Sequence, residues 1–244
     1  MKHENTFFAV LLASTMALFA TTSAHAQATI DQNKALAGSV TPGDSPGFPV
    51  SIAVPGAYKL TGNLVVPAGL NGIEILTEGV TIDLNGFRIA SGGVCTRNGV
   101  SFAVTCNNPA MGKHGIHVAG SVASVIRNGT IQGFEMGVMS LGGVVESLVV
   151  KHNGTGVHFE SYFAASRATG ITAEMNQTGV MMGWGLIERS VATANQVGFA
   201  GATTASSSVA ESHTTHNAIG IRDAAIRANR VSANKVDLSG TVAF

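Results

Sequence analysis

A degenerate repeat in the second half of the chain limits the possible folds more than any other feature. Glycine followed by an apolar residue recurs at steps of 19 to 23 residues. These pairs are Gly115-Ile116, Gly137-Val138, Gly156-Val157, Gly179-Val180, Gly198-Phe199 and Gly220-Ile221. A repeat of this length, with no helical pattern inside each unit, predicts a solenoid of short strands.

Each repeat predicts one strand after the glycine and another before a recurring asparagine. Alternation along these strands directs apolar residues into a shared core, and about eight such coils fit between Ile52 and Leu238. Asparagines that occupy the same turn on successive coils can hydrogen-bond to one another as a ladder. The ladder is expected to comprise Asn128, Asn153, Asn176, Asn195, Asn217 and Asn234.

The first 26 residues have the pattern of a secretory signal peptide. A basic start precedes an apolar run, and Ala24-His25-Ala26 fits the cleavage site, so Gln27 is the first mature residue. The alternative is a retained anchor, but the apolar run is short for a bilayer span. With no membrane span predicted in the mature chain, we expect a secreted or periplasmic protein.

The mature chain is expected to be one domain with a covered end. Residues 27–50 are predicted to form an N-terminal cap and loop, in which residues 30–37 form a short helix that Gly38 ends. Such a helix would cover the open core and unpaired strand edges of the solenoid, which occupies residues 51–244.

Residues 91–113 break the repeat and are expected to be a loop inserted into one coil. They contain both cysteines of the chain, Cys95 and Cys106. Two cysteines this close in an oxidising compartment predict a disulfide, with two free thiols as the alternative. Two ligands do not make a metal site, and no metal is expected.

The charge composition argues against one class of partner. Charged residues make up 11% of the chain and the formal net charge is zero, whereas ordinary domains carry about 25% charged residues. Since no basic surface is expected, nucleic acid is not a predicted partner.

Three phrases of the sequence carry a family resemblance. Residues 55–64 read PGAYKLTGNL, residues 80–87 read VTIDLNGF and residues 127–134 read RNGTIQGF. Together they resemble the small secreted bacterial right-handed parallel β-helix proteins of the pectin-lyase-like superfamily. The resemblance implies a right-handed coil with three parallel sheets and an external groove, where enzymatic relatives hold polysaccharide.

The resemblance does not extend to the chemistry of these enzymes. Calcium as a cofactor is implied by the resemblance alone. The calcium-dependent lyases cluster aspartates on one sheet, whereas the mature aspartates of this chain are scattered. They are Asp31, Asp44, Asp83, Asp223 and Asp237.

One row of side chains is the candidate functional surface. The position two residues after each glycine should point outward, and it is occupied by His117, Met139, His158, Met181, Ala200 and Arg222. Glu160, Tyr162, Trp184 and Arg189 are expected near His158. This surface is either an ordinary solvated face or a site for a sugar chain, with His117, Glu160, Trp184 and Arg222 in contact with the sugar.

Three functions are considered for this protein. The first is binding of polysaccharide or cell-surface glycan. The second is a polysaccharide lyase acting by β-elimination, in which His158 abstracts the proton, Tyr162 protonates the leaving oxygen and Arg189 neutralises the carboxylate. The third is a structural or adhesion role without catalysis, with residues 95–106 contacting a partner. The sequence leaves the glycan and the oligomeric state open.

Overall fold

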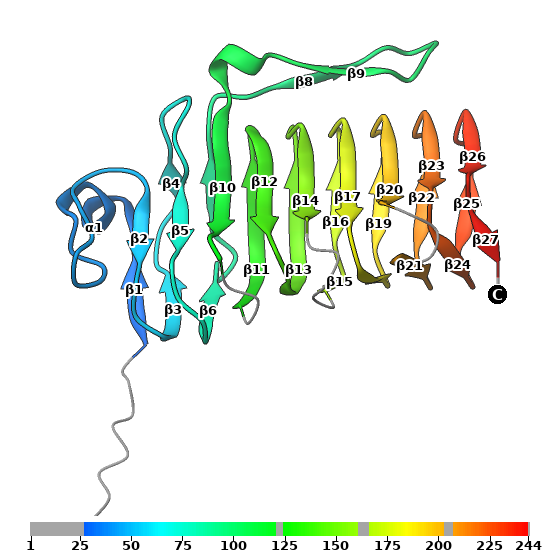
Figure 1. The fold of residues 1–244 in the computed structure, drawn as a ribbon. Helices are drawn as coiled ribbons and strands as arrows, with labels where there is room; N and C mark the ends of the chain where they lie inside the picture. Colours follow the sequence, from blue (N-terminus) through cyan, green and yellow to red (C-terminus); the bar gives the residue numbers. More distant parts are fainter. Residues whose placement is uncertain (1–26, 121–123, 161–165, 203–206, 244) are drawn as a thin grey trace, which may run out of the picture.

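The computed structural model describes residues 27–120, 124–160, 166–202 and 207–243, and the predicted signal peptide lies outside these ranges. The chain winds into an elongated stack of coils whose strands pair in parallel with the coils before and after (Figure 1). The prediction of an all-β parallel solenoid is therefore confirmed.

One side of the solenoid is a nine-stranded parallel sheet, to which successive coils contribute one strand each. Its strands in spatial order are β2 (Val50–Ile52), β5 (Ile73–Ile75), β10 (Gly112–Val118), β12 (Phe134–Ser140), β14 (Thr155–Phe159), β17 (Thr178–Met182), β20 (Val197–Gly201), β23 (Ile219–Arg222) and β26 (Val236–Ser239).

The other sides belong to a sixteen-stranded parallel sheet. Its main path is β1 (Ala28–Ile30), β3 (Gly56–Leu60), β6 (Val80–Asp83), β11 (Ser124–Gln132), β13 (Gly143–Lys151), β15 (Ser166–Thr169), β18 (Gly185–Glu188), β21 (Ser207–Ala210), β24 (Ala225–Arg227) and β27 (Val242–Ala243). Six strands branch from this path: β4 (Leu64–Val65), β7 (Arg88–Ala90), β16 (Thr172–Glu174), β19 (Val191–Thr193), β22 (His213–Thr215) and β25 (Arg230–Ser232).

The sixteen-stranded sheet bends around a corner, so the coils have three sides although hydrogen bonding defines two large sheets. Strands β11 and β13 pass through this corner without a break, at Asn128 (φ 62°) and Ser147 (φ 52°). The resemblance implies three separate sheets. In the structure, two of these three sheets are joined into the sixteen-stranded sheet, because β11 and β13 continue through the corner.

The glycine repeat has a steric cause. The repeated glycines stack on one another through the nine-stranded sheet, and a Cβ atom at each would press on the backbone of the next coil. At Gly198 it would lie 2.5 Å from the carbonyl oxygen of Gly220. The next residue of each repeat faces the core, and Val157, Val180 and Phe199 are fully buried.

The N-terminal end of the stack is covered, as the capping-helix prediction requires. Helix α1 (Gln32–Ala37) begins at the N-cap Asp31 and ends at Gly38, which has φ 66°. The side chain of Gln32 hydrogen-bonds both the N–H and the carbonyl of Val65 in β4. Ser51 in β2 is paired in the same way. Its N–H donates to the Asp44 carboxylate at 2.8 Å, and its carbonyl accepts from the Thr41 hydroxyl at 2.6 Å. Edge groups that would otherwise be unpaired are thereby satisfied.

The insertion between β7 and β10 is an antiparallel hairpin that runs across the tops of the following coils (Figure 1). It consists of β8 (Cys95–Arg97) and β9 (Val104–Cys106), followed by the short 3-10 helix η1 (Asn108–Ala110). The predicted disulfide between Cys95 and Cys106 is present. The hairpin contacts a later coil at His152, the residue after β13. The Nδ1 atom of His152 lies 3.2 Å from both the backbone nitrogen and the carbonyl oxygen of Cys95.

The corner between β16 and β17, repeated along the stack, carries an asparagine ladder. From Asn176 onward, each side-chain oxygen accepts from the backbone N–H and the side-chain amide of the asparagine one coil earlier, at 2.8 to 3.2 Å. We call this ladder the asparagine corner, and its members are Asn153, Asn176, Asn195, Asn217 and Asn234.

Asn128 does not belong to the asparagine corner, which corrects the sequence interpretation. It is exposed at the bend of β11, where its side chain hydrogen-bonds Asp83 at 3.3 Å. The ladder position of that coil is held by Phe134, whose backbone N–H donates to the Asn153 side chain at 3.0 Å. Phenylalanine fills the core there but cannot extend the ladder.

A second ladder lies at the bend of the sixteen-stranded sheet, and the sequence interpretation missed it. The backbone N–H of Ile171 donates to the Ser190 hydroxyl, that of Ser190 to the Ser212 hydroxyl, and that of Ser212 to the Asn229 side chain, at 2.9 to 3.2 Å. We call Ser190, Ser212 and Asn229 the serine corner. Since its residue type changes along the stack, no single letter recurs to reveal it.

Candidate functional site

The outer face of the nine-stranded sheet carries a row of side chains in strict register. His117 pairs with Met139, Met139 with His158, and His158 with Met181. Before His117 the row contains Ser51 in β2 and Glu74 in β5, and past Met181 it continues through Ala200, Arg222 and Ser239. We call this the outward row. The four side chains from His117 to Met181 are half-buried, so solvent reaches them.

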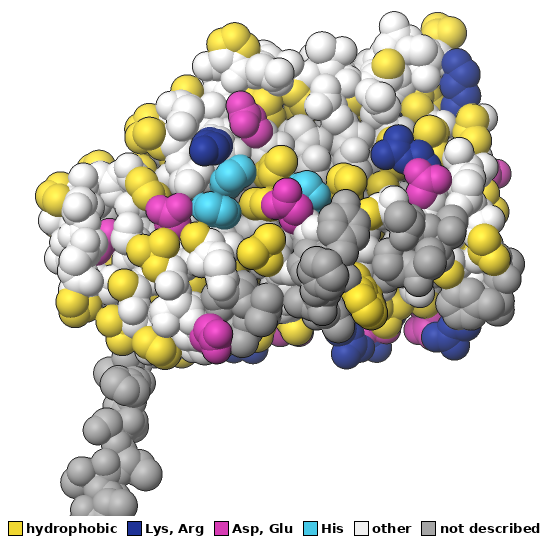
Figure 2. Space-filling view, in the orientation of Figure 1, with side chains coloured by type: hydrophobic (Ala, Val, Ile, Leu, Met, Phe, Trp, Pro, Cys, Tyr) yellow, Lys and Arg dark blue, Asp and Glu magenta, His cyan; other side chains and the backbone are white. Residues whose placement is uncertain are grey.

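Three histidines, His114, His117 and His158, lie in the N-terminal half of this face. The Nδ1 atom of His117 lies 3.1 Å from the Glu74 carboxylate. The rings of His114 and His117 are 4.9 Å apart, and His114 pairs with Met136 in the next coil. Histidine and acidic side chains are clustered on this face in Figure 2.

Burial keeps two of these imidazoles neutral. It lowers the pKa of His114 to about 4, with further lowering from the positive charges of His117, Lys113 and His158. Burial also lowers the pKa of His158, although the Glu160 carboxylate opposes this shift. At neutral pH both rings therefore offer a nitrogen lone pair, which can accept a proton or bind a metal.

The sequence interpretation did not recognise Glu74 or His114 as parts of this cluster. Glu74 lies in the alternating stretch Ile73-Glu74-Ile75, which reads as a strand with an outward carboxylate. Its partner His117 is 43 residues away because the hairpin lengthens this coil. The irregular spacing conceals the pairing, and only the strand register reveals it.

The other predicted contact residues lie around this face at different places. Glu160 follows β14 directly and is exposed. Trp184, with 46% of its surface exposed, follows the end of β17 by two residues and so lies one coil further along the same edge. Arg222 lies three coils beyond His158 in the outward row and forms an ion pair with Asp223 at 3.4 Å. Tyr162 lies outside the described residues.

Two of the residues predicted for β-elimination, His158 and Arg189, do not share a face. His158 points outward from the nine-stranded sheet, whereas Arg189 lies between β18 and β19 of the sixteen-stranded sheet. Arg189 contacts Glu188 at 3.0 Å, and Glu188 also accepts a hydrogen bond from Arg167. The left-handed backbone of Arg189, with φ 46°, turns the chain at the bend. Arg189 is therefore a corner residue and not a partner of His158.

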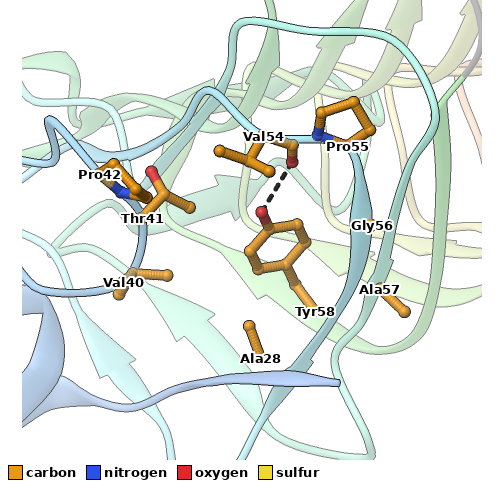
Figure 3. A pocket seen from close by; sticks show the side chains of 9 residues that line it. All are labelled: Ala28, Val40, Thr41, Pro42, Val54, Pro55, Gly56, Ala57 and Tyr58. Carbon is orange, nitrogen blue, oxygen red and sulfur yellow. Dashed lines mark hydrogen bonds between the residues drawn. The ribbon is translucent and has the colours of Figure 1, made fainter. Parts of the chain in front are cut away.

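A small hollow at the N-terminal end is a weaker candidate (Figure 3). Its volume is about 210 Å³, and its lining is formed by Ala28, Val40, Thr41, Pro42, Val54, Pro55, Gly56, Ala57 and Tyr58. The Tyr58 hydroxyl is already bonded to the carbonyl of Val54 at 2.7 Å, and burial raises the pKa of Tyr58. With no other titratable side chain in its lining, this hollow offers little chemistry.

Within the described ranges, no group of three or more His, Cys, Asp or Glu side chains is arranged to hold a metal ion. The same ranges contain no helix long and apolar enough to cross a bilayer. Comparison with family models, with curated proteins and with solved structures finds no match. The fold and the face of the nine-stranded sheet are thus the basis for a functional proposal.

Proposed function

We propose that this protein binds a polysaccharide or cell-surface glycan along the outer face of its nine-stranded sheet. The outward row is the observation that carries the proposal. A linear polymer lying across the strands would meet a new outward side chain about every 4.8 Å. Glu74, His117 and His158 offer hydrogen-bonding groups within this row, and such groups suit sugar hydroxyls.

Trp184 supplies the flat surface that a sugar ring packs against. Its indole is exposed at the edge of the nine-stranded sheet, one coil beyond Glu160. An exposed aromatic side chain beside polar groups is typical of binding surfaces, because it combines apolar contact area with a hydrogen-bond donor. The Trp184 edge and the histidines of the outward row together form the proposed glycan site.

The proposal includes export and membership of the pectin-lyase-like superfamily. A disulfide is compatible with an oxidising compartment outside the cytosol. The stacked parallel strands agree with the coil that the resemblance implies. Amino-terminal sequencing of the protein recovered from the periplasm or medium would test export, with Gln27 as the expected first residue.

Affinity electrophoresis tests glycan binding and the face that is used. The mature protein is run through gels that contain different acidic and neutral polysaccharides, and retardation in at least one gel is expected. Trp184→Ala and His117→Ala should each reduce the retardation. Arg189→Ala is the matched control, since this residue lies on the other sheet, and it should leave the mobility unchanged. Uniform migration of the wild type in every gel would refute the proposal.

The same gels bear on catalysis. If one glycan retards the protein, β-elimination would produce an unsaturated product that absorbs in the ultraviolet. His158 is the described residue suited to abstract a proton, because its imidazole is neutral at pH 7. If the wild type forms this product and His158→Ala does not, the protein is a lyase. If none of the glycans that retard the protein yields the product, the protein binds glycan without cleaving it.

A second candidate function, adhesion through the β8–β9 hairpin, rests on the exposure of its tip. Val100 is 87% exposed, and Arg97 stacks on the Phe102 ring at 3.9 Å, which stiffens the loop. An exposed apolar residue on a disulfide-closed hairpin is suited to contact another protein. Val100→Asp would abolish adhesion to cells and leave glycan retardation intact if the hairpin were the contact.

A further inference from the structure

The outward row contains sulfur and imidazole in alternation, which glycan binding does not require. His117, Met139, His158 and Met181 follow one another on adjacent strands of the nine-stranded sheet. Beside them, His114 is paired with Met136. Methionine usually fills gaps in a core, but Met139 and Met181 point away from the core and are half-buried.

The register places Met139 between two histidines. Neighbouring strands lie about 4.8 Å apart, so the backbones of His117 and His158 are separated by about 10 Å, with Met139 midway. All three side chains leave the same face of the sheet. Two imidazoles and one thioether can therefore converge on a single atom above Met139.

The hydrogen bonding of His117 is that of a metal ligand. Its Nδ1 atom lies 3.1 Å from the Glu74 carboxylate, which fixes the ring and places the proton on Nδ1. The lone pair of Nε2 is then left for another partner. Histidines that bind metals almost always hold their second nitrogen in this way.

His158 has binding capacity that the fold does not use. Its Nδ1 atom is buried and has no hydrogen-bond partner among the described residues. A buried polar atom without a partner is unusual in a folded protein, and a bound ion is one physical reason for it. The neighbouring His114 has an Nδ1 atom in the same condition.

We propose that the thioether of Met139 and the imidazoles of His117 and His158 form a binding site for Cu(I). Thioether sulfur is a soft ligand that selects monovalent copper, and imidazole also suits copper. Zinc sites use thiolate, imidazole and carboxylate groups instead. The site shares His117 and His158 with the proposed glycan surface, but it rests on the hydrogen bonding of these imidazoles and the register of Met139, not on glycan binding.

A competition titration tests the site. The mature protein is mixed without oxygen with Cu(I) held by a chromogenic chelator, and loss of the chelator's colour reports transfer to the protein. The wild type should withdraw one Cu(I) per chain. Met139→Leu should weaken binding by at least about a hundredfold, which exceeds the usual effect of a supporting residue.

Met182→Leu is the matched control. Met182 is adjacent to Met181 but points into the core and is fully buried, so this variant removes a sulfur without touching the outer face. Exchange of methionine for leucine nearly preserves volume and is usually tolerated, so circular dichroism should show that both variants fold. Unchanged Cu(I) affinity in Met139→Leu, or no transfer of Cu(I) to the wild type, would overturn the proposal.

Two further measurements separate the Cu(I) site from a site made of histidines alone. Glu74→Gln should lower Cu(I) affinity by about 10- to 100-fold, while X-ray absorption still shows one sulfur neighbour. Zn(II) binding that persists unchanged in Met139→Leu, without Cu(I) binding in the wild type, would indicate a histidine-only site. The Cu(I) titration contains no glycan and the gels contain no copper, so failure of either proposal leaves the other testable.

Discussion

Two corners of the solenoid solve the same backbone problem with different side chains. At both corners one residue adopts positive φ, as Met175 does (φ 55°) before Asn176 and Arg189 (φ 46°) before Ser190. The turn leaves backbone N–H groups that the strands cannot pair. An amide has two donor hydrogens and an acceptor oxygen, whereas a hydroxyl has one donor hydrogen. The asparagine corner can therefore bind more groups per coil than the serine corner.

The hydrogen bonds show the difference. The Asn176 side chain accepts from the N–H and the amide of Asn153 and donates to Val150 and Asn195. The Ser190 hydroxyl accepts from Ile171 and donates to Glu188. Since the asparagine corner borders the nine-stranded sheet, its stronger network holds the register on which the outward row depends.

Of the changes at the two corners, replacement of Asn176 by alanine should lower the free energy of unfolding the most. The change removes four hydrogen bonds at a fully buried position and leaves the N–H of Asn153 without a partner. We expect a loss of about 3 kcal/mol or more in the free energy of unfolding. Denaturant unfolding followed by circular dichroism measures it. A loss below about 1 kcal/mol would show that neighbouring coils satisfy these groups without the amide.

The equivalent change at the other corner, Ser190→Ala, should cost less. It leaves the N–H of Ile171 unpaired and removes one further bond, to Glu188. We expect a loss of about 1 to 2 kcal/mol under the same conditions. If Ser190→Ala were as costly as Asn176→Ala, the proposed difference between amide and hydroxyl ladders would be wrong.

The smallest effect should be a pH dependence at the serine corner. Hydrogen bonding from Arg167, followed by the charges of Arg167 and Arg189, lowers the pKa of Glu188. A depressed carboxyl pKa stabilises the fold above the unfolded value, near 4.5, and this contribution is lost as pH falls through the folded value. Because both arginines are more than half exposed, Glu188→Gln should cost less than about 1 kcal/mol at pH 7.

Unfolding of the wild type and of Glu188→Gln between pH 7 and pH 3 measures this dependence. The gap between the two proteins should close as the pH falls below 4.5. Asn176→Ala serves as the comparison, since the partners of the Asn176 side chain do not titrate, and its cost should not follow the titration of Glu188. A gap for Glu188→Gln that stays constant to pH 3 would contradict the assignment.

All five members of the asparagine corner could be predicted from the sequence, but the coil at which the ladder begins could not. Asn128 shares the residue type and approximate spacing of the ladder, yet it lies at the bend of β11. Coil length varies by several residues, so spacing alone does not say to which corner an asparagine belongs. The strand register does, and it gives the ladder position to Phe134.

The candidate site shows the same division. The two-residue period of a strand predicts which side chains point outward, and the outward row from His117 to Arg222 lies in register as alternation requires. The spacing gives no reason to place Arg189 on a different side from His158. The turns at the bend and at the asparagine corner are each made at one residue with positive φ, and alanine, arginine, serine and histidine all occupy such positions in this chain, so no residue type marks a corner.

The sequence by itself determined the solenoid, the buried apolar rows and the direction of the outward row. These follow from local periodicity and from glycines that leave room for the next coil. Only the tertiary structure decided that Glu74 meets His117 across the inserted hairpin, that Met139 lies between two histidines, and that Arg189 turns a corner. Such neighbours come from adjacent coils, and coils of unequal length bring together residues whose separation in the chain follows no fixed period.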